Sequence, residues 1–279
     1  MSDYTVTFDN LGEVTDLQRG LWPEGQPLGR HFSVTRALPR ILASLDELGL
    51  HSTFFVEGLN TELYPGTLAE IAAAGHEVAC HGYGHQLVYE LSQEEFREDV
   101  RRCKELLEDL SGTPVRGYRA PCFSITDWSI PILQELGFTY DSSVFPTVAH
   151  DRYGSLAGVA PGKQVIELEQ GFHEVCVSCL MVGSRGLPWG GGGYFRLIPY
   201  GLFRRGVARI LRAQEPYVFY IHPWEIDPDQ PRVNGLSSLY RFRHYVGLGQ
   251  TEHRFSSLLD DFHWVGVGDV LAARGDPIP

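Results

Sequence analysis

The sequence predicts a single-domain α/β protein built on a parallel sheet with crossover helices. First, β-rich runs alternate with helical segments of about 10–18 residues through residues 1–145, the pattern of a parallel sheet. Second, 279 residues is a normal length for one α/β barrel, and 43% apolar residues can form a sizeable core. Third, no internal repeat and no linker divides the chain, so residues 1–279 are expected to form one domain.

The elements of the first half have clear start and stop signals. Ser92 and Glu95 form a capping box that opens a helix, and Gly112 closes it. Gly49 and Gly75 stop two earlier helices. The expected strands are 4–8, 52–56, 77–80, 115–118 and 139–144, and the expected helices are 35–48, 63–74, 92–110 and 126–137.

The second half is less regular. Residues 146–200 are rich in Gly, Pro and His, so we expect long loops there, including the glycine run 190–193. That run either shapes a loop facing substrate or is a flexible connector, since the dinucleotide-binding glycine pattern is absent. A helix over 201–211, a strand over 217–221, helical stretches within 236–259 and a last strand over 264–267 follow.

Charge and composition exclude several functions. The net charge of −12 argues against nucleic acid or an anionic membrane as the main partner, because both require a cationic face. No run of 18 apolar residues is present, so no membrane-spanning helix is expected. The first residues lack a basic and an apolar leader region, which predicts a cytoplasmic protein. The five cysteines are expected to be reduced thiols.

Polar clusters follow four of the expected strands. Because parallel strands end at the same edge of a sheet, these clusters should converge on one face. A carboxylate, three histidines and an arginine together suit metal-assisted hydrolysis. The clusters are Asp9-Asn10, His81-Gly-Tyr-Gly-His85, Arg119-Ala-Pro121 and His222-Pro-Trp-Glu225.

The spacing of His81 and His85 allows both imidazoles to bind one metal ion. An oxygen ligand from Asp9 or Asn10 would complete a set of three and leave positions open for water and substrate. Alone, the pair could arise by chance among 11 histidines. The other clusters at strand ends favour a site.

These residues resemble the motifs of the polysaccharide deacetylases, carbohydrate esterase family 4. The family's T-F-D-D motif corresponds to Thr7-Phe-Asp-Asn10, and its H-[ST]-x-x-H motif to the segment 81–85. Its R-x-P motif corresponds to Arg119-Ala-Pro121, and its last motif to the strand end before His222. Order and spacing agree over about residues 4–225. Segments such as 116–121, 141–146 and 222–232 look similar to the branch found beside exopolysaccharide and exosortase loci, although the first motif does not.

The resemblance implies a distorted (β/α) barrel of about seven parallel strands and hydrolysis of an N-acetyl group on a sugar. It implies that Asp9 is the general base and His222 the general acid. His81 and His85 would bind a divalent metal, most simply zinc, with residue 10 as the third ligand. Arg119 would orient Asp9 or complete the pocket wall. The family also allows dimers or tetramers built through residues 236–259.

Two positions depart from the family pattern. Asn10 stands where a metal-binding Asp is usual, and its neutral amide would leave the site about one charge unit more positive and hold metal less tightly. Gly82 stands where Ser or Thr is usual, and Tyr83 could replace the lost hydroxyl.

Residues near the motifs are candidates for substrate contact. Asp141 is also a candidate to hold Arg119 or His222. Trp224 either walls the pocket and stacks on a sugar or belongs to the core. The candidates for substrate binding are Tyr83, Pro121, Asp141, Tyr194, Trp224 and Glu225.

Three functions compete. The first is a metal-dependent amide hydrolase that removes acetyl from an amino sugar or a related small N-acyl substrate. The second is a cyclic amide or ureide hydrolase that works without a metal, which Asn10 favours. The third is a non-catalytic carbohydrate-binding protein, against which the retention of both Asp9 and His222 argues.

Overall fold

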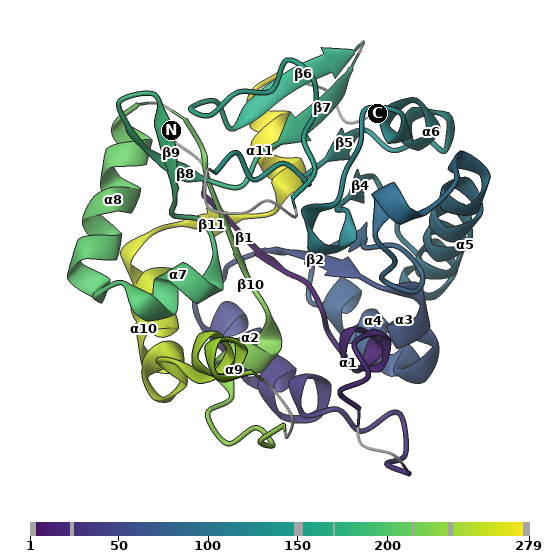
Figure 1. The fold of residues 1–279 in the computed structure, drawn as a ribbon, viewed down its shortest axis with the longest axis horizontal. Helices are drawn as coiled ribbons and strands as arrows, with labels where there is room; N and C mark the ends of the chain where they lie inside the picture. Colours follow the sequence, from purple (N-terminus) through teal and green to yellow (C-terminus); the bar gives the residue numbers. More distant parts are fainter. Residues whose placement is uncertain are drawn as a thin grey trace.

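A mostly parallel, strongly curved sheet forms the centre of the molecule (Figure 1). The computed structural model describes residues 4–22, 25–147, 153–169, 171–213, 215–233 and 237–275. Within them the main sheet has nine strands in the order β10-β1-β2-β3-β4-β5-β7-β6, and β11 also pairs with β1. The strands are β1 (Tyr4–Phe8), β2 (Thr53–Val56), β3 (Glu77–Cys80), β4 (Gly117–Tyr118), β5 (Tyr140–Asp141), β6 (Val165–Glu169), β7 (Phe172–Val175), β10 (Tyr217–Ile221) and β11 (Trp264–Val265).

All of these strand pairs are parallel except β6 with β7. The predicted α/β class with a parallel, barrel-like sheet is therefore confirmed. The α-helices are α1 (Val14–Gln18), α2 (Leu38–Glu47), α3 (Gly58–Leu63), α4 (Pro65–Ala73), α5 (Gln93–Ser111), α6 (Ser129–Glu135), α7 (Gly192–Leu197), α8 (Tyr200–Arg212), α9 (Ser238–Tyr245), α10 (Leu248–Asp261) and α11 (Val267–Ala273).

The longest helix shows why the sequence signals were informative. Ser92 and Glu95 form the predicted reciprocal capping box at the start of α5. Gly112 ends the helix in the left-handed conformation, with φ of 68°. Four apolar side chains on one face of α5 are buried, and the helix packs against α3, α4 and β3.

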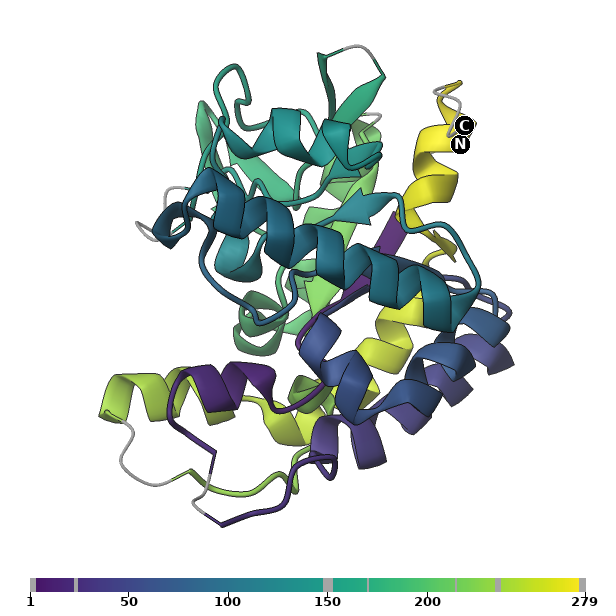
Figure 2. The same cartoon turned by 90° about the vertical axis from the view of Figure 1, so that its right-hand side faces the viewer.

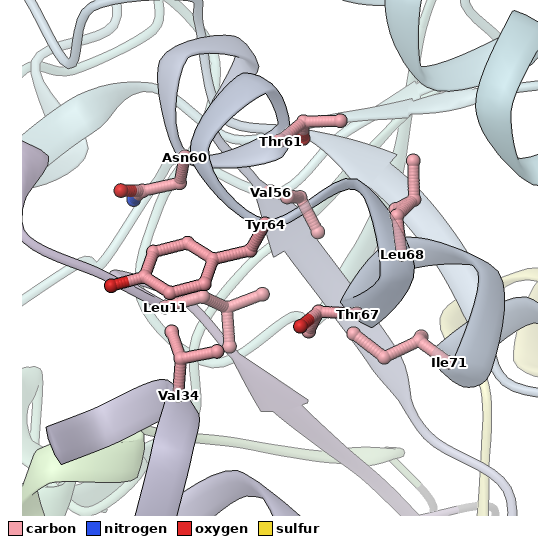
Figure 3. Close-up of a pocket in the computed structure, with 9 residues that line it drawn as sticks. All are labelled: Leu11, Val34, Val56, Asn60, Thr61, Tyr64, Thr67, Leu68 and Ile71. Atoms are coloured by element: carbon pink, nitrogen blue, oxygen red, sulfur yellow. The ribbon is translucent and has the colours of Figure 1, made fainter. Parts of the chain in front are cut away.

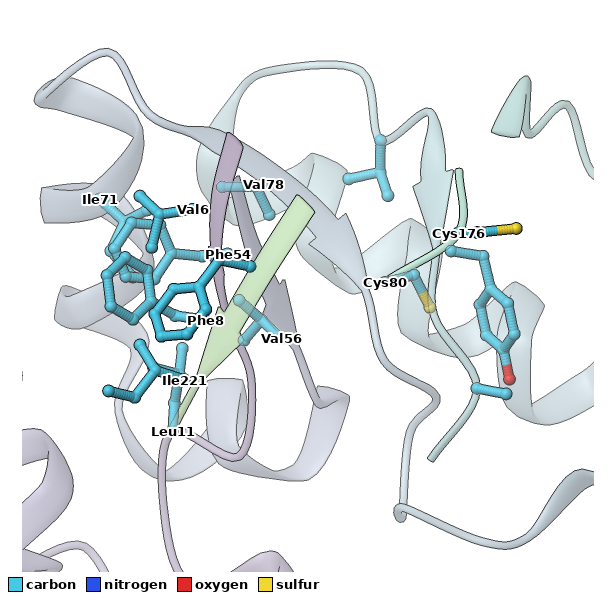
Figure 4. Packing of buried hydrophobic residues seen from close by; sticks show 14 of the residues in the cluster. Val6, Phe8, Leu11, Phe54, Val56, Ile71, Val78, Cys80, Cys176 and Ile221 are labelled. Atoms are coloured by element: carbon cyan, nitrogen blue, oxygen red, sulfur yellow. The ribbon is translucent and has the colours of Figure 1, made fainter. Parts of the chain in front are cut away.

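The core lies on both faces of the central strands, which explains why β1 and β2 are almost wholly buried. Phe8 of β1 and Phe54 of β2 stack with ring centroids 4.7 Å apart. Figure 4 shows these rings with Val6, Val56 and Ile71 in one apolar layer. This layer holds β1 and β2 together, and the polar residues that directly follow these two strands lie in the site described below.

Residues 146–200 differ from the expected long loops. The segment contains β6, β7 and α7, and a separate hairpin of β8 (Cys179–Val182) and β9 (Arg185–Pro188). The chain between β7 and β8 also bridges the two sides of the curved sheet. The amide of Val177 donates to the carbonyl of Val144, and that of Ser178 to the carbonyl of Val218.

Helices α1 and α9 both lie at the same end of the molecule (Figure 2). A hydrogen bond of 2.8 Å from Arg19, next to α1, to the hydroxyl of Tyr240 in α9 joins them. Among the described residues, no helix has the length and apolar character needed to cross a membrane.

Candidate metal and proton-transfer site

Five charged or ionisable residues directly follow parallel strands and meet at one edge of the sheet. Asp9, Glu57 and His81 follow β1, β2 and β3, while Arg119 and His222 follow β4 and β10. Asp9 is 3% exposed, and its two oxygens lie 3.4 Å from Nε2 of His222 and 3.6 Å from Nη1 of Arg119. Strands far apart in the sequence therefore bring the proposed base and acid together.

His81 and His85 are buried, with ring centroids 5.1 Å apart. Nδ1 of His81 donates to the carbonyl of Arg119 at 2.8 Å, and Nδ1 of His85 lies 2.9 Å from the amide oxygen of Gln18. Because both partners are acceptors, the proton sits on Nδ1 and Nε2 carries a free lone pair. Burial lowers the pKa of His81 well below its usual value and that of His85 to about 3, so both rings stay neutral.

Glu57 is the third member of this group. A carboxylate oxygen of Glu57 and ring nitrogens of His81 and His85 all lie within 4.8 Å of one another, a set that we call the histidine cluster. Glu57 is fully buried, and its Oε2 accepts a hydrogen bond from Asn60. Burial raises the pKa of Glu57 to about 7, partly offset by that hydrogen bond.

The histidine cluster contains unsatisfied ligand atoms. Among the described residues, Oε1 of Glu57 and Nε2 of His85 are buried without a hydrogen-bond partner. Such atoms are costly in a protein interior unless a ligand satisfies them. One carboxylate oxygen and two imidazole nitrogens suit a divalent transition metal. These residues therefore fit the metal that the sequence motifs imply.

Asn10, the expected third ligand, has a different contact. Its Oδ1 accepts a hydrogen bond of 3.0 Å from the hydroxyl of Thr15. Asn10 adopts the left-handed conformation, with φ of 55°, and lines the large cavity described below. The carboxylate found with the two histidines is Glu57, whereas Asn10 is tied to α1.

His222 is held in position by Glu225. Nδ1 of His222 lies 2.8 Å from Oε1 of Glu225, whose other oxygen forms a 2.7 Å ion pair with Arg196. Burial lowers the pKa of His222, but the charges of Asp9 and Glu225 outweigh it and raise the pKa above its usual value. Glu225 is 1% exposed and its described contacts are with His222 and Arg196, so its predicted contact with substrate stays a prediction.

Arg119 forms a second buried group, which we call the arginine cluster, with Thr7 and Ser142. Its guanidinium donates to the Thr7 hydroxyl at 2.7 Å and to the carbonyl and hydroxyl of Ser142, both at 2.8 Å. The guanidinium also lies over the ring of Phe55 at 4.1 Å. Arg119 is fully buried and so braces the strand ends beside Asp9.

Trp224 lies where substrate could reach it. Its ring stacks with those of His222 and His244 and lines the large cavity, which favours the pocket-wall interpretation. Pro121 is buried in a short turn after Arg119, beside Gly82. Tyr194, on α7, packs against an apolar group that includes Phe123 and Tyr220.

Two other candidates, Tyr83 and Asp141, are not among the described residues that line the cavity. The Tyr83 hydroxyl accepts a hydrogen bond from Arg102, whose guanidinium lies 3.7 Å above the ring. Asp141 is fully buried and accepts a hydrogen bond from Ser143. Both side chains make contacts within the scaffold, and their predicted roles in substrate binding stay predictions.

A cavity of about 590 Å³ adjoins this edge of the sheet and is lined by Asn10, His222 and Trp224 among others. It lies between the segments 10–36 and 222–244. A second cavity, of about 10 Å³, lies beneath β2 and α3 and is lined mainly by apolar side chains such as Leu11 and Leu68 (Figure 3). Only the larger cavity has room for a sugar-sized molecule.

Sequence reasoning missed Glu57 and Gln18. Glu57 directly follows the β-rich run of β2, the same signal that selected Asp9, Arg119 and His222. The sequence analysis predicts a strand over 52–56 and assigns no role to the residue that follows it. Gln18 carried no signal, because its contact with His85 depends on how α1 folds back over the strand ends.

The architecture and the site define a class, an α/β barrel with a histidine–carboxylate centre at its strand ends. Comparison with known proteins names the family. Residues 23–140 match the model of the polysaccharide deacetylase family, and residues 142–272 match a domain of unknown function, DUF3473. The chain therefore carries a polysaccharide deacetylase domain, as its motifs predicted. The nearer exopolysaccharide branch stays a prediction.

Curated relatives match parts of the chain. A peptidoglycan deacetylase-like protein of Gibberella zeae is 34% identical over 38% of this chain and 32% of its own length. A peptidoglycan deacetylase of Helicobacter pylori is 30% identical over 46% of this chain and 41% of its own. The chain thus spans less than half the length of these relatives.

Solved structures share the fold over nearly the whole chain. A Mycobacterium smegmatis protein described as a polysaccharide deacetylase matches with a TM-score of 0.65 and 22% identity, covering 98% of this chain and 90% of its own. A carbohydrate esterase family 4 pseudoenzyme from Bacillus anthracis matches with a TM-score of 0.52 and 15% identity, covering 97% and 66%. At these identities the likeness concerns the fold alone.

Proposed function

We propose that the chain is a metal-dependent hydrolase that removes an N-acetyl group from an amino sugar or a related N-acyl substrate. The observation that carries the proposal is the histidine cluster, with the Asp9–His222 pair at the same edge of the sheet. The deacetylase domain and the deacetylases among its relatives support the reaction class.

Glu57, His81 and His85 would hold the metal. The ion, which we propose to be zinc, would polarise the acetyl carbonyl and stabilise the oxyanion that develops on it. Glu57 supplies the negative charge that Asn10 lacks. The neutral rings of His81 and His85 offer Nε2, while their Nδ1 hydrogen bonds fix the orientation of each ring.

Asp9 and His222 would move the protons. Asp9 accepts a proton from water at a carboxylate oxygen as the water oxygen bonds to the acetyl carbon. His222 then donates the proton on Nε2 to the amine nitrogen as the carbon–nitrogen bond breaks, so that acetate and a free amine leave. Glu225 holds the opposite ring nitrogen throughout and favours the protonated imidazole.

Metal content distinguishes the two ligand sets. We expect about one divalent ion per chain by elemental mass spectrometry after purification without added metal or chelator. Glu57→Gln should lose most of it, whereas Asn10→Gly, which tolerates the positive φ, should retain it. If Asn10→Gly lost the metal and Glu57→Gln retained it, the third ligand would be Asn10.

Acetate release tests the reaction itself. The wild-type protein should release acetate from N-acetyl amino sugars, and chelation should abolish the release until zinc is restored. Ring opening of hydantoin-like substrates that survives chelation would instead favour the cyclic amide hydrolase. Sugar binding without any turnover, unchanged in Asp9→Ala, would favour a binding protein.

A further inference from the structure

The large cavity is cationic, although the chain as a whole is strongly acidic. Among the described residues, four arginines line it, Arg19, Arg30, Arg36 and Arg232, against one carboxylate, that of Asp16. The net charge of the whole chain is −12, so the charge of this cavity is opposite in sign to that of the protein as a whole. Focused positive potential in a concave site attracts anions.

Two of these five charges already have partners. Arg36 forms an ion pair of 2.7 Å with Asp227, and Asp16 lies 3.4 Å from Nε2 of His31. Within the part of the chain that the structure describes, no carboxylate pairs with Arg19, Arg30 or Arg232. No described carboxylate therefore neutralises their charge, and Arg232 lies over the ring of Tyr245 at 4.1 Å.

Arg19 is the arginine that the fold connects to the reaction centre. It directly follows Gln18, whose side chain contacts His85. Its guanidinium donates to the neutral hydroxyl of Tyr240 at 2.8 Å and contacts the Cys122 sulfur at 3.9 Å.

A row of aromatic rings lies along the wall of the cavity. Trp224 stacks with His222 and with His244, and the ring centroids of Trp224 and His244 lie 4.2 Å apart. Tyr240 continues this row, 6.0 Å beyond His244, and its hydroxyl accepts from Arg19. Aromatic faces of this kind pack against the apolar face of a sugar.

We propose that the substrate is an anionic N-acyl sugar, whose carboxylate or phosphoryl group binds Arg19 while its N-acyl group reaches the histidine cluster. Guanidinium groups bind both anions through paired hydrogen bonds. Arg30 and Arg232 would add to the attraction at the rim. The inference rests on the proposed function and specifies its substrate class.

The test compares matched substrates that differ only in charge. Acetate release would be measured from N-acetylglucosamine, its 1-phosphate and its 6-phosphate, and N-acetylmuramic acid, with zinc-loaded protein. At least one anionic sugar should exceed the neutral sugar roughly tenfold or more in kcat/KM. The phosphate and carboxylate arms identify which anion is used, and equal or higher rates with the neutral sugar would overturn the inference.

Two variants locate the effect. Arg19→Gln should bring the ratio of anionic to neutral kcat/KM close to one. Arg40→Gln removes the same charge from α2, where Arg40 is paired with Glu252 outside the cavity lining, and should leave the ratio unchanged. An anion preference that persists in Arg19→Gln, or disappears equally in Arg40→Gln, would refute the assignment to Arg19.

A binding measurement separates this inference from the proposed function. If no sugar releases acetate, the deacetylase proposal fails, and calorimetry with the same sugars still tests the cavity. Tighter binding of N-acetylglucosamine 1-phosphate, its 6-phosphate or N-acetylmuramic acid than of N-acetylglucosamine, lost in Arg19→Gln, would support anion recognition. Equal binding of charged and neutral sugars would overturn it.

Discussion

The histidine cluster and the arginine cluster are neighbouring buried groups that differ in whether their polar atoms have hydrogen-bond partners. The guanidinium of Arg119 has hydrogen-bond partners on the side chains and backbone around it. In the histidine cluster, Oε1 of Glu57 and Nε2 of His85 have none among the described residues. The contrast indicates that the arginine cluster serves the scaffold and the histidine cluster serves a ligand, because unsatisfied buried atoms destabilise a protein without one.

Removing a proposed ligand should produce the largest effect on activity. We expect His81→Ala to lower kcat/KM for acetate release by about 10⁴-fold or more and to abolish metal binding. The free energy of unfolding of the metal-free protein should fall by only about 1–3 kcal/mol, because the variant also loses the buried hydrogen bond from Nδ1 of His81 to the carbonyl of Arg119. Activity within tenfold of wild type would show that the cluster is not the reaction centre.

Removing the central cation of the arginine cluster should instead affect folding. Arg119→Met leaves Asp9 and Ser142 without their buried partner, so the free energy of unfolding should fall by about 3–5 kcal/mol. Denaturant titration of the metal-free protein measures this change. Any folded fraction should still bind metal, because His81 contacts only the backbone carbonyl of residue 119. A stable variant that cannot bind metal would contradict the view that the arginine cluster stabilises the fold while the histidine cluster binds the metal.

A smaller effect is expected from the residue that orients His85. Gln18→Leu removes the acceptor for Nδ1, so metal affinity should fall by about 10–100-fold without loss of the ligand itself. Competition with a chelator of known affinity measures the change. Gln86→Leu, an exposed glutamine next to the same histidine, provides the matched control and should leave affinity unchanged.

The smallest effect concerns proton donation. Glu225→Gln removes an anion that favours protonated His222, so the pKa of His222 should fall. If His222 is the acid, the alkaline limb of the kcat/KM profile moves to lower pH by about one unit. The profile should be recorded at a temperature where the variant is folded, because Arg196 also loses its partner. An unshifted alkaline limb would remove His222 from the acid role.

The sequence was sufficient for the fold class and for most strand ends, because strands β1–β5 follow a regular βα order with strong capping signals. It was insufficient for β6–β9. These strands are short, β6 is partly exposed with an irregular register at 167–169, and β8 and β9 form a separate hairpin, so no alternating pattern marks them.

The site was predictable to the extent that it depends on topology. Asp9, His81 and His222 were found because parallel strands end at one edge. Contacts made by folded segments, such as Gln18 with His85 or Arg196 with Glu225, depend on tertiary packing and have no local signature. The identity of the metal, the cytoplasmic location and the oligomeric state remain predictions.

The pairing of β1 has a consequence for how the protein becomes active during synthesis. The first described strand hydrogen-bonds with β10 and β11, which lie near the end of the described chain. A nascent chain that has emerged only through residue 140 already holds Asp9 and every member of the histidine cluster, but it lacks His222 and one side of β1 is unpaired. Late pairing of such distant strands is slow. The proposed site, which needs both Asp9 and His222, is therefore complete only after β10 has paired with β1.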